Sequence, residues 1–343
     1  MGYTEKEIQE YLQREEEYML LPLSQLPELS PNCQAFPLVE EFIARSELLQ
    51  IKAYKQNEVT VIDCGVNVPG GWEAGLLFAS ICLGGLAQVR LHWSDFSGFR
   101  WPAVEVVTDH PIRACMASQF AGWPIKNGEL LAMGSGPGRA IVHEGSLFEI
   151  LGYEDHSERA VLCLESEELP SKEVIQYLLE ECHCDPKNLY ILVAPTVSHV
   201  GSVQIAARAL ETGLSKLMGL GYNLGKIVSG WGICPVPPVA CDNLSALGRT
   251  NDAILYGSTV LYNLRDEENL DSLVKQVPSC ASREYGRPFK EVYKDYGNFY
   301  DIDPLLFSPA EVWLCNLHSG RSWQAGSLRP DILRHSFGLE MNS

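Results

Sequence analysis

Short apolar runs alternate with helix-periodic segments through the middle of the chain, and this alternation constrains the fold more than any other feature. AVLCLES (160–166) and NLYILVAPT (188–196) have the apolar, β-branched composition of buried strands. SKEVIQYLLEEC (171–182), between them, has helical spacing, and a second helical segment (201–213) precedes the strand-like KIVSG (226–230). Strands that alternate with helices favour a layered α/β unit in which at least part of the sheet is parallel.

The rest of the chain extends this pattern to a fold of two domains. At 343 residues, the chain is long enough for two units of the usual size, about 100 to 200 residues each. Helices are expected over 35–51, 72–83 and 111–120, strands over 58–66, 102–109 and 252–264, and a hairpin over 311–326 that turns at Ser319 and Gly320. We therefore expect a two-domain layered α/β fold, with residues 1–34 as an acidic helical extension and residues 35–343 as the body made of two α/β domains.

The charge and hydropathy exclude some classes of function. Lys and Arg number 26 against 44 Asp and Glu, which gives a formal net charge of -18. A nucleic-acid-binding protein needs a basic face to meet the phosphate backbone, so nucleic acid is excluded as a partner. The sequence has no run of about 18 apolar residues that would span a membrane, and its N-terminus is acidic where a signal peptide is basic. We therefore expect a cytoplasmic protein.

The cysteines favour a reducing environment over a disulfide framework. Eleven cysteines are scattered along the chain, mostly singly and inside apolar runs, and their number is odd. Thiols in such positions behave as small apolar side chains. ECHCD (181–185) is the one dense cluster, and because no second cluster at zinc spacing follows it, no metal site is expected.

The segment GSVQIAARALETG (201–213) carries the strongest candidates for catalytic groups. It has the spacing of one helix, whose apolar stripe toward the sheet is made of Val203, Ala207, Leu210, Leu214 and Leu217. Beside that stripe, Arg208 and Glu211 lie three residues apart in a narrow polar band edged by apolar residues. Such a band suits the wall of a cleft; the alternative is an i,i+3 ion pair on an exposed helix. Ser198 is the expected N-cap, and the strand before it ends where α/β sheets bind ligands.

The glycine-rich loop GSGPGRA (134–140) allows two interpretations. In the first, the backbone amides of Gly134, Ser135 and Gly136 and the guanidinium of Arg139 bind an anionic group of a ligand. In the second, the same residues only form a tight turn between a strand and a helix.

Polar residues near other glycines are weaker candidates. Glu73 lies in GGWEAG, and Arg249, Asn251 and Asp252 lie in GRTND. We expect them on turns, where they either border a substrate pocket or build the turn itself.

Two further sites contain residue types that often act in catalysis. Asp109 and His110 occur in TDHP, where the position favours an Asp that caps the following helix. His199 stands alone before the helix of Arg208 and is expected at the surface. We assign neither histidine a role in the chemistry.

Several unusual strings occur together and in a fixed order. They include VIDCGV (61–66), GGWEAGLLF (70–78), TDHP (108–111), MGSGPGRA (133–140), CLESEELP (163–170), VAPTVSHVGSVQIAARALETG (193–213) and LGRTNDAILYG (247–257). With these strings the chain closely resembles the methenyltetrahydromethanopterin cyclohydrolases, enzymes of one-carbon metabolism in methanogens and in some bacteria that oxidise C1 compounds. The similarity runs from about Ala35 to Leu339.

The resemblance implies a fold, a reaction and an assembly. The family has two α/β domains with the pterin in a cleft between them, and its members are homotrimers. They interconvert 5,10-methenyltetrahydromethanopterin plus water and 5-formyltetrahydromethanopterin. The resemblance implies that the pterin carrier is the substrate and that neither a metal nor a redox cofactor takes part.

The resemblance also implies roles for individual residues. The Arg and Glu of the family's helix motif form its catalytic pair, and they match Arg208 and Glu211. Because the substrate carbon is already a cationic amidinium, the reaction needs a positioned water and a base, which Glu211 would supply. Arg208 would keep that carboxylate ionised and orient it. Gly138 replaces the usual Ala of the family, which loosens the glycine-rich turn.

Two alternatives stay open on the sequence alone. A catalytically silent pterin-binding or regulatory protein would keep the fold, although loss of Arg208 or Glu211 is the simplest way to silence the site and both are present. A cyclohydrolase acting on a folate carrier would keep the chemistry, but the motifs do not resemble those of folate cyclohydrolases.

Overall fold

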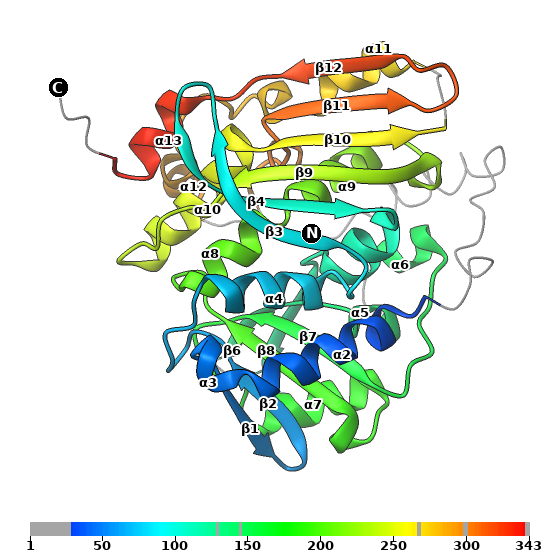
Figure 1. Ribbon diagram of the computed structural model, residues 1–343, viewed down its shortest axis with the longest axis vertical. Coiled ribbons are helices and arrows are strands. Elements are labelled where there is room, and N and C mark those ends of the chain that lie inside the picture. Colours follow the sequence, from blue (N-terminus) through cyan, green and yellow to red (C-terminus); the bar gives the residue numbers. More distant parts are fainter. Residues whose placement is uncertain (1–28, 128–129, 144–145, 266–268, 298–300, 340–343) are drawn as a thin grey trace. The chain divides into compact units, whose positions relative to one another are not determined.

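The computed structural model describes residues 29–127, 130–143, 146–265, 269–297 and 301–339 (Figure 1). Two compact units divide the chain, one made of Met1–Ala87 and Ile112–Gly201 and the other of Gln88–Pro111 and Ser202–Ser343. Each unit contains its own six-stranded sheet together with helices, so the predicted two-domain α/β fold class is confirmed. The acidic helix expected near the N-terminus lies outside the described residues, and the first described helix begins at Pro31.

The sheet of the first unit is mixed, with a parallel centre. Its strands are β1 (Lys52–Gln56), β2 (Val59–Asp63), β5 (Trp123–Asn127), β6 (Leu130–Ser135), β7 (Ala160–Glu165) and β8 (Leu189–Ala194). They are arranged in the order β1-β2-β8-β7-β6-β5. The neighbours β2, β8 and β7 run parallel, whereas β1, β6 and β5 pair antiparallel. The predicted strand–helix alternation therefore does produce a partly parallel sheet.

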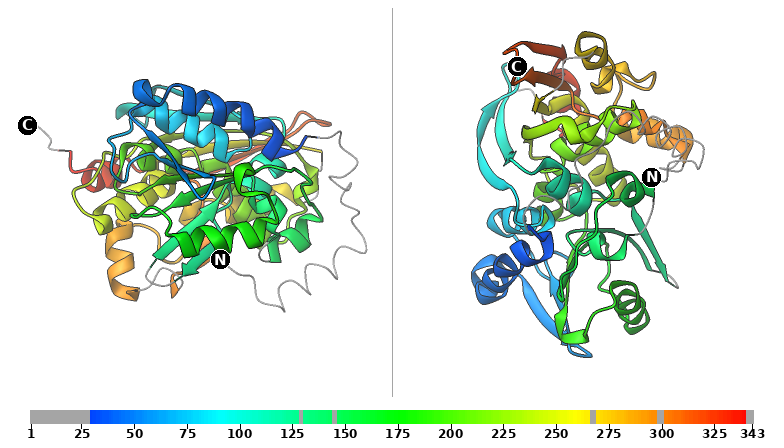
Figure 2. Two further views of the ribbon diagram at one scale, coloured as in Figure 1. Left: turned by 90° about the horizontal axis from the view of Figure 1, so that it is seen from below. Right: turned by 90° about the vertical axis from the view of Figure 1, so that its right-hand side faces the viewer.

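Helices cover both faces of this sheet (Figure 2, right). The helices of the unit are α2 (Pro31–Ala44), α3 (Ser46–Leu49), α4 (Trp72–Cys82), a π-helix (Ile112–Gln119), α5 (Arg139–Val142), α6 (Ser146–Leu151) and α7 (Lys172–Cys182). Successive strand residues point to opposite faces. Thus Ile62, Val161, Cys163 and Leu192 pack in one core with α2 and α4, and Val61, Leu162, Leu164 and Ile191 pack in another with α7.

Several predicted helix boundaries of this unit are confirmed, and two details differ. α4 begins after Gly71 and ends before Gly84 and Gly85, whose φ angles of 69° and 67° suit glycine. The helix expected over 35–51 divides at Arg45 into α2 and α3. The helix expected after Pro111 is a π-helix, a form that periodicity does not distinguish from an α-helix.

The sheet of the second unit is largely antiparallel. Its strands are β3 (Gln88–Asp95), β4 (Arg100–Thr108), β9 (Ile227–Pro235), β10 (Thr259–Leu264), β11 (Glu311–Asn316) and β12 (Ser322–Gly326). Their order is β12-β11-β10-β9-β4-β3, in which β10 and β11 run parallel. The predicted hairpin is confirmed as β11 and β12, and the Asn316 carboxamide oxygen accepts the amides of His318 and Ser319 in its turn.

The helices of the second unit correct one strand prediction. The longer helices are α9 (Ala209–Gly219), α10 (Asn243–Gly257), α12 (Phe289–Tyr296) and α13 (Pro330–Ser336). Residues 252–257 belong to α10, so the strand expected over 252–264 is wrong in its first half. Asp242 caps α10 by accepting from the Ser245 amide, and the helix continues to Gly257. A short apolar run is compatible with a buried helix as well as with a buried strand, so the apolar pattern of residues 252–257 does not distinguish the two.

No helix in the described ranges is long and apolar enough to cross a membrane. All eleven cysteines are thiols, and six of them are buried. In the part of the chain that the structure describes, no group of three or more His, Cys, Asp or Glu residues is placed to hold a metal ion.

Candidate active site

The segment that carries Arg208 and Glu211 is two helices, so the single helix predicted for it is wrong. α8 (His199–Ala206) ends two residues before Arg208, and α9 begins at Ala209. The amide of Arg208 bonds to the Ile205 carbonyl at 3.0 Å, three residues back, where an α-helix would bond four back. Arg208 therefore occupies the N-cap position of α9, and Glu211 lies in the first turn of that helix.

Arg208 and Glu211 form a buried ion pair. Nη1 of Arg208 lies 3.8 Å from Oε2 of Glu211, and each residue is only 6% exposed. This burial rules out the alternative of an ordinary surface pair, which solvent would screen. At 3.8 Å these two atoms attract as charges at a distance longer than a hydrogen bond.

Gln204 orients the guanidinium of Arg208. Its side-chain oxygen accepts from Arg208 Nε at 3.0 Å, and Gln204 itself is 2% exposed. Because Nε donates to Gln204, the guanidinium is held from the α8 side of the break while Nη1 faces Glu211. The predicted polar band is therefore present, and it is buried.

The predicted apolar stripe is confirmed. Its residues, Val203, Ala207, Leu210, Leu214 and Leu217, are all at most 1% exposed. α9 packs against β9 and β10 of the second sheet, as expected for a stripe that faces a sheet. The expected N-cap is also confirmed, because the Ser198 hydroxyl accepts the Gly201 amide at 2.9 Å.

Lys216, also on α9, is a buried charged residue that is not among the candidates predicted from the sequence. It is 4% exposed, its Nζ donates to the Leu305 carbonyl, and burial lowers its pKa to about 8. The only available signal was a lysine five residues after Glu211 on a helix with few charges.

The glycine-rich loop has the geometry of a tight turn. β6 ends at Ser135 and α5 begins at Arg139, with Gly136 at φ 94°. The amides of Gly136 and Gly138 donate to the carbonyls of Ser118 and Val161, each at 2.8 Å. The Ser135 hydroxyl donates to the Cys163 carbonyl at 3.0 Å. These donors are used inside the fold, which favours the turn interpretation; anion binding by Gly134 and its neighbours stays a prediction.

Arg139, the cation of this loop, is packed among aromatic rings. It is 2% exposed, and its Nη1 donates to the Phe120 carbonyl at 2.5 Å. Its guanidinium carbon lies 5.6 Å from the ring centre of Phe120 and 5.3 Å from that of Phe148. Cation–π contacts of this kind stabilise a buried arginine within the fold.

Glu73 lies at the surface of the first unit. It lies inside α4, in the first helical turn, so the loop turn predicted for it is wrong. Its side chain is 56% exposed, and it forms an ion pair with Arg45. Together with Trp72 and His199 it lines a shallow hollow of that unit. His199 is exposed as expected, and its ring centre lies 5.1 Å from that of Trp72. A role of Glu73 in substrate binding stays a prediction.

The three candidates in GRTND lie inside α10, and the turn predicted for them is wrong. Arg249 donates from Nε to the Ser336 carbonyl and from Nη1 to the Val239 carbonyl, each at 3.1 Å. Asn251 donates to the Leu247 carbonyl one helical turn back. Both groups thus bond backbone carbonyls of their own unit, and their contact with substrate stays a prediction.

Asp252 is fully buried and accepts two hydrogen bonds from uncharged groups. The Phe289 amide donates to Oδ1 at 2.8 Å, and the Ser336 hydroxyl donates to Oδ2 at 2.6 Å. Burial raises the pKa of this carboxyl to about 7. Asp252 thereby links α10 to the start of α12 and the end of α13.

In TDHP the side chain that accepts a backbone amide is Thr108, so the helix cap predicted for Asp109 is wrong. The Thr108 hydroxyl oxygen accepts from the His110 amide at 2.9 Å, and Thr108 is buried whereas Asp109 is exposed. A Thr at the end of a strand was a usable signal for this turn.

Two carboxylates at strand ends, Asp63 and Glu165, lie within the family-like strings of the sequence but are not among the predicted site residues. Asp63 ends β2 and is fully buried, and its oxygens accept the amides of Gly65, Val66 and Asn67 at 2.7 to 3.0 Å. Glu165 ends β7 and accepts from the Thr196 hydroxyl, just beyond β8. The signal was an acidic residue directly after an apolar strand, at the sheet edge where α/β proteins place ligands.

Comparison with known proteins identifies the family. The family model described as Cyclohydrolase (MCH) matches residues 30–337. Relatives named methenyltetrahydromethanopterin cyclohydrolase include those of Methanococcoides burtonii, 40% identical over 91% of this chain and 99% of the relative, and Methanocaldococcus jannaschii, 43% identical over 90% and 98%. The relative from Methanothermobacter marburgensis is 42% identical over 91% of this chain and 100% of its own length. The resemblance seen in the sequence is thereby confirmed.

Proposed function

The chain belongs to the MCH cyclohydrolase family, and on this premise we propose that it interconverts 5,10-methenyltetrahydromethanopterin plus water and 5-formyltetrahydromethanopterin. The observation that carries the proposal is the buried Arg208–Glu211 pair at the start of α9. A buried carboxylate beside a guanidinium is the kind of group that a hydrolase needs to take a proton from water.

The proposed reaction begins at the electrophilic carbon of the substrate. That carbon lies between two nitrogens that share a positive charge, so water adds to it without prior activation of the carbon. The water oxygen bonds to the carbon, and one water proton passes to the Glu211 carboxylate. The bond from carbon to the second nitrogen then breaks, that nitrogen gains a proton, and the carbon keeps the oxygen as a formyl group. One proton is released overall.

Arg208 serves the carboxylate in this proposal. Its positive charge favours the ionised form of Glu211, which is the form that accepts a proton. Gln204 fixes the guanidinium through Nε, so the charge stays on the side of Glu211. An arginine suits this position because its planar group offers donors in two directions at once.

The proposal includes the properties that the resemblance implies. No atom is oxidised or reduced in the reaction, so we propose that it proceeds without a redox cofactor. The substrate carbon is already cationic, so we propose that no metal is needed to polarise it. We also propose that the protein works as a homotrimer in the cytoplasm.

An absorbance assay tests the proposal. The purified protein is mixed with 5,10-methenyltetrahydromethanopterin, and the loss of the methenyl chromophore is followed against a sample without protein. Catalysed loss with the methanopterin substrate, and none with the methenyl folate, is the expected result. Loss with the folate alone would assign the other carrier. Binding of the methanopterin substrate with no loss of absorbance would show a silent pterin-binding protein.

A further inference from the structure

A buried tyrosine hydroxyl bonds the helix turn that carries Glu211. Tyr262 lies on β10 and is fully buried. Its hydroxyl donates to the carbonyl of Leu210 at 2.7 Å, and Leu210 directly precedes Glu211. The bond spans 52 residues of sequence, so it fixes the first turn of α9 to the sheet of the second unit.

A glycine makes room for this hydroxyl. A Cβ atom at Gly213 would lie 2.2 Å from the Tyr262 hydroxyl oxygen and 3.1 Å from its ring carbon Cζ. A side chain at this position would therefore displace either the tyrosine or the helix. Glycine inside a helix destabilises that helix relative to alanine. The sequence nevertheless has glycine two positions after Glu211, at the point where the Tyr262 hydroxyl approaches the helix backbone.

The same turn packs closely on the neighbouring strand. The Leu210 side chain lies over β9 at Gly230 and Gly232, where added Cβ atoms would come within 3.1 and 3.0 Å of it. Leu210 is therefore held through its carbonyl by Tyr262 and through its side chain by β9. These contacts leave the backbone next to Glu211 little freedom to shift.

We infer that Tyr262 is a positioning residue for Glu211, acting through the Leu210 carbonyl. The inference rests on the proposed function, in which the Glu211 carboxylate must lie within hydrogen-bond reach of the attacking water. Without the bond from Tyr262, the first turn of α9 can move relative to β10, and the Glu211 carboxylate then occupies a wider range of positions. A smaller fraction of these positions places the carboxylate within reach of the attacking water. The effect therefore falls on turnover more than on substrate binding.

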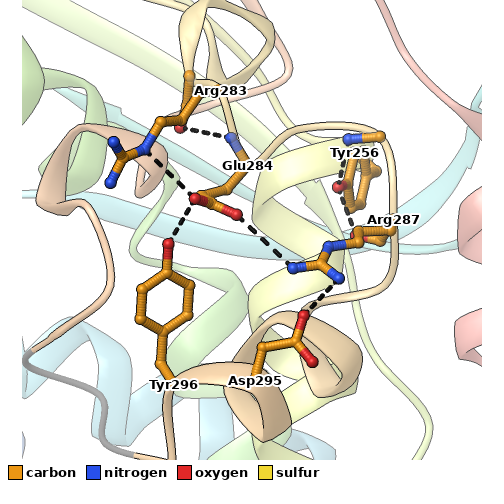
Figure 3. A network of polar contacts seen from close by, with 8 residues as sticks. Tyr256, Arg283, Glu284, Arg287, Asp295 and Tyr296 are labelled. Atoms are coloured by element: carbon orange, nitrogen blue, oxygen red, sulfur yellow. Dashed lines mark hydrogen bonds and ion pairs between the residues drawn. The ribbon is translucent and has the colours of Figure 1, made fainter.

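Tyr256 offers a matched control in the same unit (Figure 3). It is 1% exposed, and its hydroxyl donates to the Arg287 carbonyl at 2.7 Å and accepts from the Gly286 amide at 3.1 Å. The surrounding network joins Arg287, on the segment that leads into α12, to Glu284 on the same segment and to Asp295 within α12. Tyr256→Phe thus removes a hydroxyl-to-carbonyl bond of the same kind and length as that of Tyr262, together with the bond from the Gly286 amide, at residues outside α9.

The test compares Tyr262→Phe with Tyr256→Phe in the full chain. We expect both variants to unfold a few degrees below wild type, because each loses a buried hydrogen bond. Only Tyr262→Phe is expected to lower kcat, by about 10-fold, with KM changed less than about 2-fold. Its kcat–pH profile should also shift on the acid side to higher pH, because the looser turn separates Glu211 from Arg208. Wild-type kcat and pH profile in Tyr262→Phe, or equal losses in both variants, would overturn the inference.

A second pair of variants separates steric from hydrogen-bonding effects. Gly213→Ala should lower both the unfolding midpoint and kcat, because its methyl group collides with the hydroxyl. Adding Tyr262→Phe to it removes the oxygen at 2.2 Å, so the midpoint should partly recover while kcat stays low. Recovery of kcat in the double variant would contradict a role for the hydroxyl bond. An inactive wild type would instead refute the proposed function, and the inference with it.

Discussion

Arg139 and Arg208 are both buried arginines at the start of a helix, one in each unit, and their surroundings differ. Arg139 donates to a carbonyl and lies against the rings of Phe120 and Phe148. Arg208 bonds Gln204 and faces the carboxylate of Glu211. In sequence, the glycine-rich loop of Arg139 allows either an anion site or a tight turn, and the segment of Arg208 predicts one unbroken helix that carries the strongest candidates for catalytic groups.

Under the proposed function, the neighbours of the two buried arginines separate a catalytic role from a structural one. A guanidinium held by a carbonyl and aromatic rings stabilises the fold locally. A guanidinium beside a buried carboxylate favours the ionised form of that carboxylate, which is the base in the proposed function. The difference predicts that comparable substitutions at the two sites affect different measurements.

Glu211→Gln should have the largest effect, because it removes the base and keeps the shape. We expect kcat to fall by about 10² or more, with a far-UV circular dichroism spectrum like that of wild type. Stability should fall as well, since Arg208 loses its ion-pair partner inside the protein. Near-normal turnover would remove Glu211 from the mechanism and erase the distinction between the two arginines.

Arg208→Lys and Arg139→Lys test the comparison directly. Lysine keeps the charge but lacks the planar fork, so Arg208→Lys should lower kcat by about 10-fold or more. Arg139→Lys should leave kcat unchanged and lower the free energy of unfolding by about 1 to 3 kcal/mol, because it loses stacking and fit. A raised KM in Arg139→Lys, at unchanged kcat, would instead support the anion-binding role predicted for the glycine-rich loop.

Asp252 should show the smallest effect, confined to stability and its dependence on pH. Burial raises the pKa of this carboxyl from 3.8 to about 7 in the folded protein, so the folded state holds its proton over that range while the unfolded state loses it. The contribution of Asp252 to stability is thus complete below pH 4 and declines as pH rises to 7, by about 1.4 kcal/mol per pH unit at most.

Urea unfolding of wild type and Asp252→Asn between pH 5 and 8 measures this contribution. The wild-type midpoint should fall relative to that of the variant as pH rises to 7 and then stay parallel to it. The kcat values of the two proteins should agree. Midpoints that stay parallel throughout would show that Asp252 titrates near its ordinary pKa.

The sequence pattern predicts much of the fold because strand and helix periodicity follow burial. The alternation over residues 160–196 and the hairpin at 311–326 are observed as expected. The apolar run in α10 was read as a strand because its residues are buried in either form. The packing of these residues against the rest of the unit determines that they form a helix and not a strand.

The sequence pattern picks out the charged pair of the candidate site but not the geometry around it. Arg208 and Glu211 stand out as a charged pair on an apolar helix, and the pair is buried. The break at Ala207 and Arg208 could not be predicted, because IAARALET consists largely of good helix formers without Gly or Pro. The contact of Tyr262 with Leu210 joins residues 52 positions apart, and no local pattern encodes it.

The break before α9 has an electrostatic consequence for Glu211. In an unbroken helix the carboxylate would lie near the middle, where the aligned peptide dipoles have little net effect. Because α9 starts at Ala209, Glu211 lies at the positive end of a helix macrodipole, in addition to the charge of Arg208. That end stabilises a nearby anion by about 0.3 to 1 kcal/mol, and somewhat more when it is partly buried. A kink of two residues therefore supplies a second source of positive potential without adding a second cation.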